Sequence, residues 1–349
     1  MSTNSIKIQN VYYMLAYVFS LLNVRGYELV GQEDFENGAE LCAAILIRGI
    51  SSQIKRGLAK DYIPINEQLS TIKGKIDVSS SVRKNTLMKS QIVCNHDEFS
   101  SNSYLNRILK TTLVILLKSD INKDLKKQIS KLLIYFSNVE VFDIKTIRWN
   151  VQFNKNNRTY QLLVYICYLV IKGLIQTTKD GTIKLRSFFD DKNMNKLYEK
   201  FILEYYRKHY PELNASSAKI SWNLDDEDDE LLPEMLSDVM LTKGDKTLII
   251  DAKYYSTIMI GHYDVKTIRS SHLYQIYAYV KNYDKQYTGN VSGMLLYAKT
   301  ENDLDFKDKD YKVNGNTLSV RTLDLNCDFE KIKRQLNEIA DSELYFESI

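Results

Sequence analysis

Apolar residues recur at helical spacing through most of the first half of the chain. A period of three to four residues places such side chains on one face of a helix, where they can pack against a core. The pattern predicts helices over residues 10–23, 38–58, 101–119, 123–136 and 162–175. Ser101 or Ser103 is the expected N-cap of the third helix. The first half of the chain is therefore expected to be mainly helical.

One strand-rich segment interrupts these helices. Residues 60–82 combine β-branched residues with Pro64 and Gly74, which favours strands and turns over helix. Lys73, Gly74 and Lys75 lie inside this hairpin-like segment. Composition by itself favours a small, locally packed β-unit with exposed lysines.

The spacing of apolar residues changes somewhere between about residue 145 and about residue 185, and a domain boundary is expected there. After the boundary, strand-like segments alternate with helical ones. The predicted elements are a helix over 194–210, strands over 218–224, 235–242 and 246–255, a helix over 270–283, a strand over 291–298, a hairpin over 311–325 that turns near 314–315, and a last helix over 328–341. We expect two domains, residues 1–165 and 166–349, and an α+β or α/β fold.

The strand predicted over 246–255 carries two charges within an otherwise apolar run. Alternate side chains of a strand share a face, so Asp251 and Lys253 lie together opposite an apolar row that can pack against a helix. Asp238 is expected mid-way along the preceding strand. The short connection between the two strands predicts an antiparallel hairpin, which would bring Asp238 beside Asp251.

Two carboxylates that converge on one point repel each other unless a cation or a proton lies between them. Mg²⁺ prefers oxygen ligands and keeps bound waters that can be activated. A neighbouring lysine can orient the attacking water or offset charge on a phosphate in the transition state. Asp238, Asp251 and Lys253 are therefore suited to metal-assisted phosphodiester hydrolysis. Spacing alone supports a plain ion pair or a solvated strand face equally well.

Longer stretches around these residues resemble known proteins. LLPEMLSD (231–238), LIIDAKYY (248–255) and the following helix HLYQIYAYV (272–280) resemble the core of PD-(D/E)xK nucleases. Earlier in the chain, the matching segments are NVYYMLAY (10–17), IKGKID (72–77), SNSYLNRILKTTL (101–113) and LYEKFILEY (197–205). Together they resemble McrC, the nuclease subunit of the McrBC modification-dependent restriction system, over nearly the whole chain.

The resemblance implies a division of labour between the two domains. Residues 1–165 would dock on a partner through the segment of about 60–82, with Lys73, Gly74 and Lys75 as contact residues. Residues 166–349 would form a PD-(D/E)xK endonuclease with a mixed sheet flanked by helices. The implied partner is an McrB-like AAA+ GTPase ring, which binds the GTP, reads methylated cytosine and is stimulated by the docked chain. Self-association within the complex is left open.

The same resemblance assigns roles to single residues. Asp238, Asp251 and Lys253 match the catalytic motif, with Mg²⁺ as the cofactor and double-stranded DNA as the substrate. The two aspartates and the carbonyl of Ala252 would bind the metal. Glu199 is a further candidate metal ligand.

Three positions near the motif carry alternatives. Glu199 and Glu204 lie on the helix that begins the nuclease core, and the alternative for both is a solvent-facing helix charge. Gln275 would contact DNA or position the attacking water, with ordinary helix-surface polarity as its alternative. His272 is expected to be a capping or surface residue.

Composition narrows the other possibilities. The net charge of the 349 residues is only +3, so bulk charge does not by itself indicate a nucleic-acid-binding protein. The four cysteines and four histidines are widely scattered, which gives no support for a structural zinc site and fits a reducing cytoplasm. No apolar run is long enough to span a bilayer, so no membrane association is expected. The acidic run 225–230 is expected to lie away from DNA.

Two other functions remain compatible with the sequence. One is a stand-alone repair or recombination nuclease of the PD-(D/E)xK superfamily, which would cut DNA without a partner. The other is a non-catalytic adaptor that activates a ring GTPase through the segment 60–82.

Overall fold

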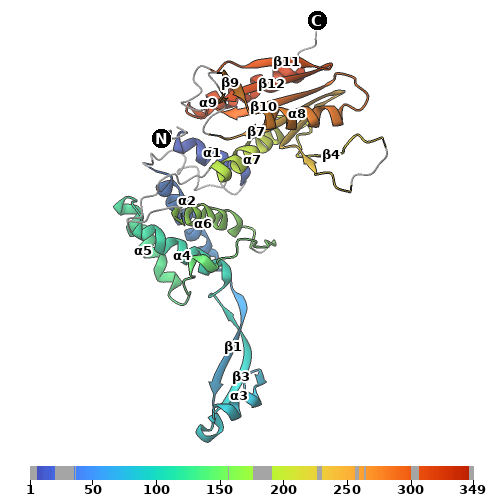
Figure 1. Ribbon diagram of the computed structural model, residues 1–349. Coiled ribbons are helices and arrows are strands. Elements are labelled where there is room, and N and C mark those ends of the chain that lie inside the picture. Colours follow the sequence, from blue (N-terminus) through green and yellow to red (C-terminus); the bar gives the residue numbers. More distant parts are fainter. Residues whose placement is uncertain are drawn as a thin grey trace. The chain divides into compact units, whose positions relative to one another are not determined.

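The computed structural model divides the chain into two compact units (Figure 1). The helical unit comprises Glu36–Phe188, and the sheet unit comprises Met1–Phe35 together with Phe189–Ile349. The structure describes residues 6–19, 35, 37–155, 157–175, 191–225, 230–255, 259–262, 265–299 and 306–345.

This division differs from the predicted boundary after residue 165. Helix α6 (Tyr160–Ile175) packs against helices α2 (Gly38–Arg56) and α4 (Tyr104–Lys118), and so belongs to the helical unit. Helix α1 (Ile8–Val18) packs against helix α7 (Asp191–His209) and belongs to the sheet unit. Spacing along the chain predicted these helices, but it does not show which of them pack together.

Four helices form the core of the helical unit. They are α2, α4, α5 (Lys123–Leu133) and α6, and α2 contacts each of the other three. Capping side chains begin three of them: Asn37 for α2, Ser103 for α4 and Asn122 for α5 each accept a hydrogen bond from a backbone N–H of the first turn. Ser103, one of the two expected caps of α4, is the residue used. Two short 3₁₀ turns follow α5, η4 (Ile134–Phe136) and η5 (Ile144–Thr146).

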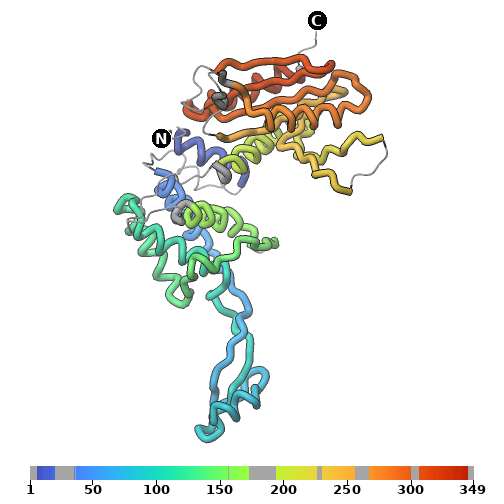
Figure 2. The backbone as a smooth tube through the Cα atoms, in the orientation of Figure 1, coloured from blue at the N-terminus to red at the C-terminus, as the bar shows by residue number. Residues whose placement is uncertain are grey.

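A long antiparallel hairpin extends from these helices (Figure 2). Strand β1 (Asp61–Leu69) pairs with β3 (Ile92–Ser100) along its whole length. The short strand β2 (Lys75–Ile76) adds to β3, and helix α3 (Val78–Arg83) with the 3₁₀ turn η3 (Thr86–Lys89) completes the tip.

The predicted segment 60–82 therefore contains only one arm and part of the tip of this hairpin. The second arm, β3, was missed by the sequence pattern. Its sequence IVCNHDEFS is mostly polar, and its last residues are largely exposed, so it lacks the alternation of a half-buried strand.

The sheet unit is built on a five-stranded mixed sheet in the order β11-β12-β10-β7-β6. Strands β7, β10 and β12 run parallel, and the two edge strands β6 and β11 are antiparallel to their neighbours. Their bounds are β6 Val239–Lys243, β7 Lys246–Lys253, β10 Val291–Ala298, β11 Lys309–Val313 and β12 Asn316–Leu323. An α+β fold with a mixed sheet flanked by helices was expected, and the structure has it.

Helices cover both faces of this sheet. Helix α8 (Ser270–Tyr283) packs on β7, β10 and β12, while α7 contacts β6 and β7. Side-chain alternation in β7 separates the two faces, because Lys253 contacts Gln275 of α8 and Tyr254 contacts the ring of Tyr198 on α7. Helix α9 (Phe329–Ala340) joins α7 through hydrogen bonds of Tyr205 and Tyr206. As a result, every residue of β7 after Lys246 is buried.

Smaller elements complete the sheet unit. They are η6 (Pro211–Leu213), β4 (Lys219–Ile220) paired with β5 (Met235–Leu236), β8 (Met259–His262) paired with β9 (Val265–Ile268), and a final turn η8 (Asp341–Tyr345). Residues 226–229 of the predicted acidic turn lie outside the described residues. In the described part of the chain, no helix combines the length and the apolar character needed to cross a membrane.

Candidate active site

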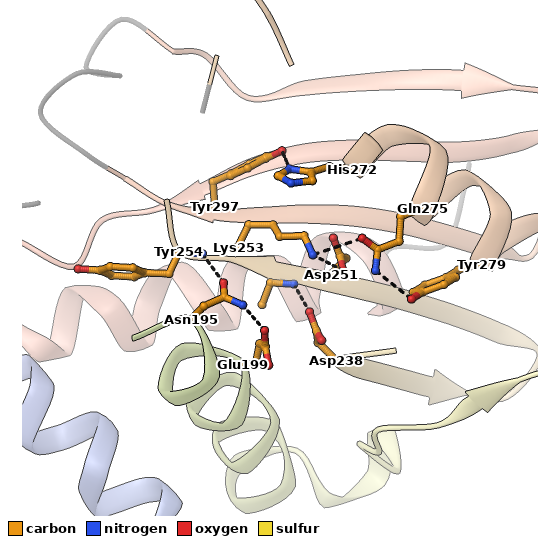
Figure 3. Close-up of polar contacts among 11 residues, drawn as sticks. Asn195, Glu199, Asp238, Asp251, Lys253, Tyr254, His272, Gln275, Tyr279 and Tyr297 are labelled. Carbon is orange, nitrogen blue, oxygen red and sulfur yellow. Dashed lines mark hydrogen bonds and ion pairs between the residues drawn. The ribbon is translucent and has the colours of Figure 1, made fainter. Parts of the chain in front are cut away.

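Asp238 lies at a bend between two strands and not in the middle of one. The predicted strand 235–242 is divided into β5 and β6, because the chain leaves its pairing with β4 and joins β7. The bend turns the carboxylate of Asp238 toward β7, where its Oδ2 accepts a hydrogen bond from the backbone N–H of Ala252 at 2.8 Å (Figure 3). The predicted antiparallel hairpin of β6 and β7 is confirmed, and it brings Asp238 close to Asp251.

Asp251 and Lys253 form a buried ion pair on the α8 side of β7. Nζ of Lys253 donates to Oδ1 of Asp251 at 2.9 Å. The two residues are only 1% and 9% exposed, so they do not form a solvated strand face. Oδ2 of Asp251 is buried and has no hydrogen-bond partner. A buried carboxylate oxygen without a partner is unfavourable, which makes it a position where a cation would be stabilised.

Burial is the main reason that both aspartates are hard to ionise. Burial and the charges of Asp251 and Glu199 raise the pKa of Asp238 to about 8. Burial also raises the pKa of Asp251, against the opposing effects of Lys253 and of the neighbouring Asp238. Burial alone would lower the pKa of Lys253, but the neighbouring Asp251 outweighs it, so the pKa is raised and Lys253 carries a proton at neutral pH. Full ionisation of both carboxyl groups in this low-dielectric setting is therefore unfavourable unless a cation compensates the charge.

Two residues of α8 extend the network from Lys253. Oε1 of Gln275 accepts a hydrogen bond from Nζ of Lys253 at 3.4 Å, and Nε2 of Gln275 donates to the hydroxyl of Tyr279 at 2.9 Å. Gln275 thus faces the cluster, as it would have to in order to contact DNA or position the attacking water there (Figure 3). Tyr279 was not singled out from the sequence, although its spacing four residues after Gln275 places both on one side of the helix.

The expectation for His272 was wrong. His272 is 7% exposed, and its Nδ1 lies 2.8 Å from the hydroxyl of Tyr297 on β10. Burial lowers the pKa of His272 to about 4, so the ring is neutral at pH 7. It supports the sheet beside Lys253, because Tyr297 is the β10 residue in register with Lys253.

The structure separates the two glutamates of α7. Asn195 joins Glu199 to the end of β7, since its Nδ2 donates to Oε1 of Glu199 and its Oδ1 accepts from the backbone N–H of Tyr254. Burial raises the pKa of Glu199, which also interacts with the charges of Lys253 and Asp251. Glu204 instead forms an ion pair with Arg207, with 2.7 Å between the charged atoms, and this pair is not part of the cluster. Asn195 was missed from the sequence, where a single asparagine in a polar helix turn has no distinguishing signal.

The donor set fits a hard divalent cation. The two aspartates and the carbonyl of Ala252 supply oxygen atoms, and the buried Oδ2 of Asp251 has no hydrogen-bond partner. Within the described residues, no three His, Cys, Asp or Glu side chains gather closely enough to hold a metal by themselves. Bound waters would complete the coordination, as is usual for Mg²⁺, and Glu199 would remain an outer group.

Comparison with known proteins now decides the family. Residues 3–298 match the family model described as "McrBC 5-methylcytosine restriction system component". The chain belongs to the McrBC family. This McrBC-family chain is 26% identical to the "Type IV methyl-directed restriction enzyme EcoKMcrBC" of Escherichia coli K12 over 345 residues, which covers 97% of the chain and 98% of that protein.

A solved structure shares the fold of this McrBC-family chain. It is the assembly of Thermococcus gammatolerans McrB AAA+ hexamers with bound McrC. The match covers 95% of the present chain and 76% of that one, with 17% identity and a TM-score of 0.53. The family that the sequence resemblance predicted is confirmed.

The hairpin tip is the second candidate site of this McrBC-family chain. Lys73, Gly74 and Lys75 are all exposed there. Gly74 has a φ of +71°, and a Cβ at this position would lie 2.4 Å from the backbone oxygen of Asn95. Only glycine meets both conditions without strain. The geometry therefore presents two lysines on either side of a backbone that is fixed against β3.

The tip also exposes apolar side chains that sequence reasoning missed. These are Ile72, Val78, Val82, Leu87 and Met88, which are between 58% and 89% exposed. Val78 and Val82 lie one helical turn apart on α3, a spacing that ordinarily indicates a buried face. A compact cluster of exposed apolar residues marks a surface that another macromolecule can cover.

Proposed function

We propose that this chain is the DNA-cleaving subunit of a GTP-dependent, 5-methylcytosine-directed restriction complex. Its sheet unit would be a PD-(D/E)xK endonuclease that hydrolyses phosphodiester bonds of double-stranded DNA with Mg²⁺. The observation that carries the proposal is the convergence of Asp238, Asp251 and Lys253 in one buried cluster, in a chain of a restriction family. The E. coli relative, which is named a methyl-directed restriction enzyme, supports the same assignment.

The residues of the cluster have distinct roles in this proposal. Asp238, Asp251 and the carbonyl of Ala252 would hold Mg²⁺, which, when bound, lowers the pKa of water and offsets phosphate charge. Lys253 keeps its proton because of Asp251 and presents a positive Nζ toward the scissile phosphate. Gln275 and Tyr279 restrict the position of Nζ through their hydrogen bonds. Glu199 contributes negative charge behind the metal ligands.

The test is cleavage of methylated plasmid by the complex of this chain with its cognate GTPase, GTP and Mg²⁺. Asp251→Asn and Asp238→Asn keep the side-chain shapes and remove ligand charge. Each is expected to lower the cleavage rate more than about 100-fold, beyond the usual effect of a residue that only supports a metal ligand. Asp245→Asn is the matched control, because Asp245 lies in the exposed turn between β6 and β7 and contacts only Asn290 in the network described. Wild-type cleavage by Asp251→Asn would overturn the assignment.

We further propose that the hairpin tip docks on an McrB-like AAA+ GTPase ring and stimulates its GTP hydrolysis. The exposed lysines and apolar residues of the tip support this role, and the archaeal structure of similar fold contains McrC bound to McrB hexamers. The double variant Lys73→Ala/Lys75→Ala is expected to lose GTPase stimulation. Asp251→Asn is expected to keep it.

These two variants also separate the other functions. A stand-alone nuclease predicts cleavage by the purified chain without partner or GTP. A non-catalytic adaptor predicts that Asp251→Asn retains every activity of the complex. Under the proposed function, cleavage requires both the intact cluster and the partner.

A further inference from the structure

A cavity lies on the flank of helix α8 that faces away from the carboxylate cluster. Its volume is about 870 Å³, and it is bounded by α8, the end of β9 and strand β11. Gln275 points from one flank of α8 toward Lys253, whereas Leu273, Tyr274 and Tyr277 of the same helix line the cavity on the other. The cavity contains none of the residues assigned to metal binding. Its size is in the range of ligand-binding pockets.

Four aromatic side chains line this cavity. Tyr274 and Tyr277 come from α8, Tyr311 from β11, and Phe306 from the segment just before β11. Tyr274 is 72% exposed and Tyr311 is 42% exposed, so these rings are accessible. Tyr277 is held in place, because its hydroxyl accepts a hydrogen bond from Nδ2 of Asn314.

Residues 307–311, which lead into and begin strand β11, place positive charge at the same cavity. Lys307 and Lys309 line it together with Tyr311, whereas Asp308 and Asp310 do not. The two aspartates are engaged elsewhere: Oδ1 of Asp308 accepts from the backbone N–H of Thr322, and Asp310 pairs with Arg321 at 2.6 Å. Residues 307–310 contain two lysines and two aspartates, and they present the lysines beside Tyr311 at the cavity while the aspartates are engaged elsewhere.

We propose that this cavity binds single-stranded DNA, with bases stacked on Tyr274 and Tyr311 and phosphates contacting Lys307 and Lys309. Exposed aromatic rings beside basic side chains are the combination by which proteins hold unpaired nucleotides, since every base has a stacking face and every nucleotide a phosphate. The two lysines favour a polyanion over an uncharged, apolar ligand, because opposite charges attract.

The location connects the cavity to the carboxylate cluster. Both lie on the face of the sheet that α8 covers. Leu318 of β12 lines the cavity, and it also belongs to the apolar core that packs against α8. In the sheet order, β11 is three strand spacings from β7, or about 14 Å at the usual spacing. A DNA strand that crosses α8 reaches both places. This inference rests on the proposed nuclease function, and it adds an unpaired stretch of the substrate held beside the cut.

The experiment measures binding of fluorescein-labelled dT15 to the full chain by anisotropy, in EDTA and without GTP or partner. Tyr274→Ala and Tyr311→Ala are each expected to weaken binding about 5- to 150-fold, the range for loss of one base stack. Tyr274→Phe should bind like the wild type, because the ring is kept. Lys307→Ala/Lys309→Ala should lower the slope of log K against log salt by about 1.4, or about 0.7 for each lost phosphate contact.

Tyr287 supplies a matched control. Tyr287 is 74% exposed but does not line the cavity, so Tyr287→Ala should bind dT15 like the wild type. Equal binding by wild type and Tyr274→Ala/Tyr311→Ala would overturn the proposal. Loss of self-association by that double variant in sedimentation velocity, with dT15 binding unchanged, would assign the cavity to a second copy of the chain and would also overturn it.

Failure of this proposal is distinguishable from failure of the proposed function. Asp251→Asn should bind dT15 at least as well as the wild type, since the assay needs no metal. If Asp251→Asn loses plasmid cleavage while the tyrosine variants keep dT15 binding, the nuclease assignment stands and the cavity assignment falls.

Discussion

Lys253 of strand β7 points toward helix α8, where the amide oxygen of Gln275 accepts a hydrogen bond from its Nζ at 3.4 Å. The other side of the amide is fixed by Tyr279, whose hydroxyl accepts from Nε2 at 2.9 Å. Lys253 is therefore held between Asp251 and Gln275. Its position depends on α8 as well as on its own strand.

Replacement of this amide should slow cleavage without weakening DNA binding. Gln275→Leu removes the acceptor for Nζ and is expected to lower the cleavage rate about 10- to 100-fold, the usual effect of a residue that orients an active group. Tyr279→Phe should have a smaller effect in the same direction. Single-turnover cleavage at saturating DNA measures the change. Tyr283→Phe, on the exposed part of the same helix, serves as the control, and a Gln275→Leu rate equal to it would exclude the positioning role.

Gly74→Ala should disrupt the hairpin tip. The new Cβ would overlap the backbone oxygen of Asn95, and alanine is also disfavoured at the left-handed φ of +71°. Gly244→Ala is a matched control, because Gly244 has a φ of +60° and open space around it. The control should lose only about 1–2 kcal/mol, the cost of a left-handed residue. We expect Gly74→Ala to lose stimulation of the partner GTPase and Gly244→Ala to keep it; equal stimulation by both would contradict the docking role of the tip.

Asp284 should stabilise the sheet unit in a pH-dependent way. Its carboxylate accepts hydrogen bonds from Thr288, Gly289 and Asn316. Burial opposes its charge, but these bonds outweigh burial and lower the pKa from 3.8 to about 2. A lowered pKa means that the stabilisation is fully present above pH of about 4 and is lost as the pH falls through about 2.

Asp284→Ala is accordingly expected to cost roughly 2–3 kcal/mol at pH 7, as for loss of hydrogen bonds to a charged group. Urea unfolding of wild type and variant between pH 2 and pH 7 gives the comparison. The difference should shrink below pH 4. A difference that stays constant down to pH 2 would show that the charge of Asp284 is not responsible.

Asp238 should have the opposite effect on the metal-free protein. Its pKa is raised from 3.8 to about 8, so the folded chain retains a proton that the unfolded chain releases. The metal-free wild type should therefore lose stability, relative to Asp238→Asn, as the pH rises from about 4 to about 8. Thermal unfolding in EDTA measures this difference. Added Mg²⁺ should restore stability most strongly near pH 8, where protons no longer compete with the metal for the carboxylate of Asp238. A stability difference between wild type and Asp238→Asn that does not change with pH would contradict the raised pKa.

The sequence predicted which residues form the cluster because these residues lie close together along the chain. Asp251 and Lys253 are two residues apart on one strand, and the short turn after β6 fixes the antiparallel pairing that brings in Asp238. The helices α8 and α9 and the strand β10 were likewise predicted within about two residues, since each has a clear apolar period. Local pattern was sufficient wherever an element buries one regular face.

Tertiary structure decided everything that depends on segments distant in sequence. The sequence could not show that Asn195 links Glu199 to β7, that His272 is buried against Tyr297, or that α1 joins the second half of the chain. It also missed β3, whose pairing with β1 is set by backbone hydrogen bonds and not by an apolar face. The physical reason is common to all of these: side-chain period reports which face of an element is buried, whereas the partner that buries it is chosen by packing across the whole fold.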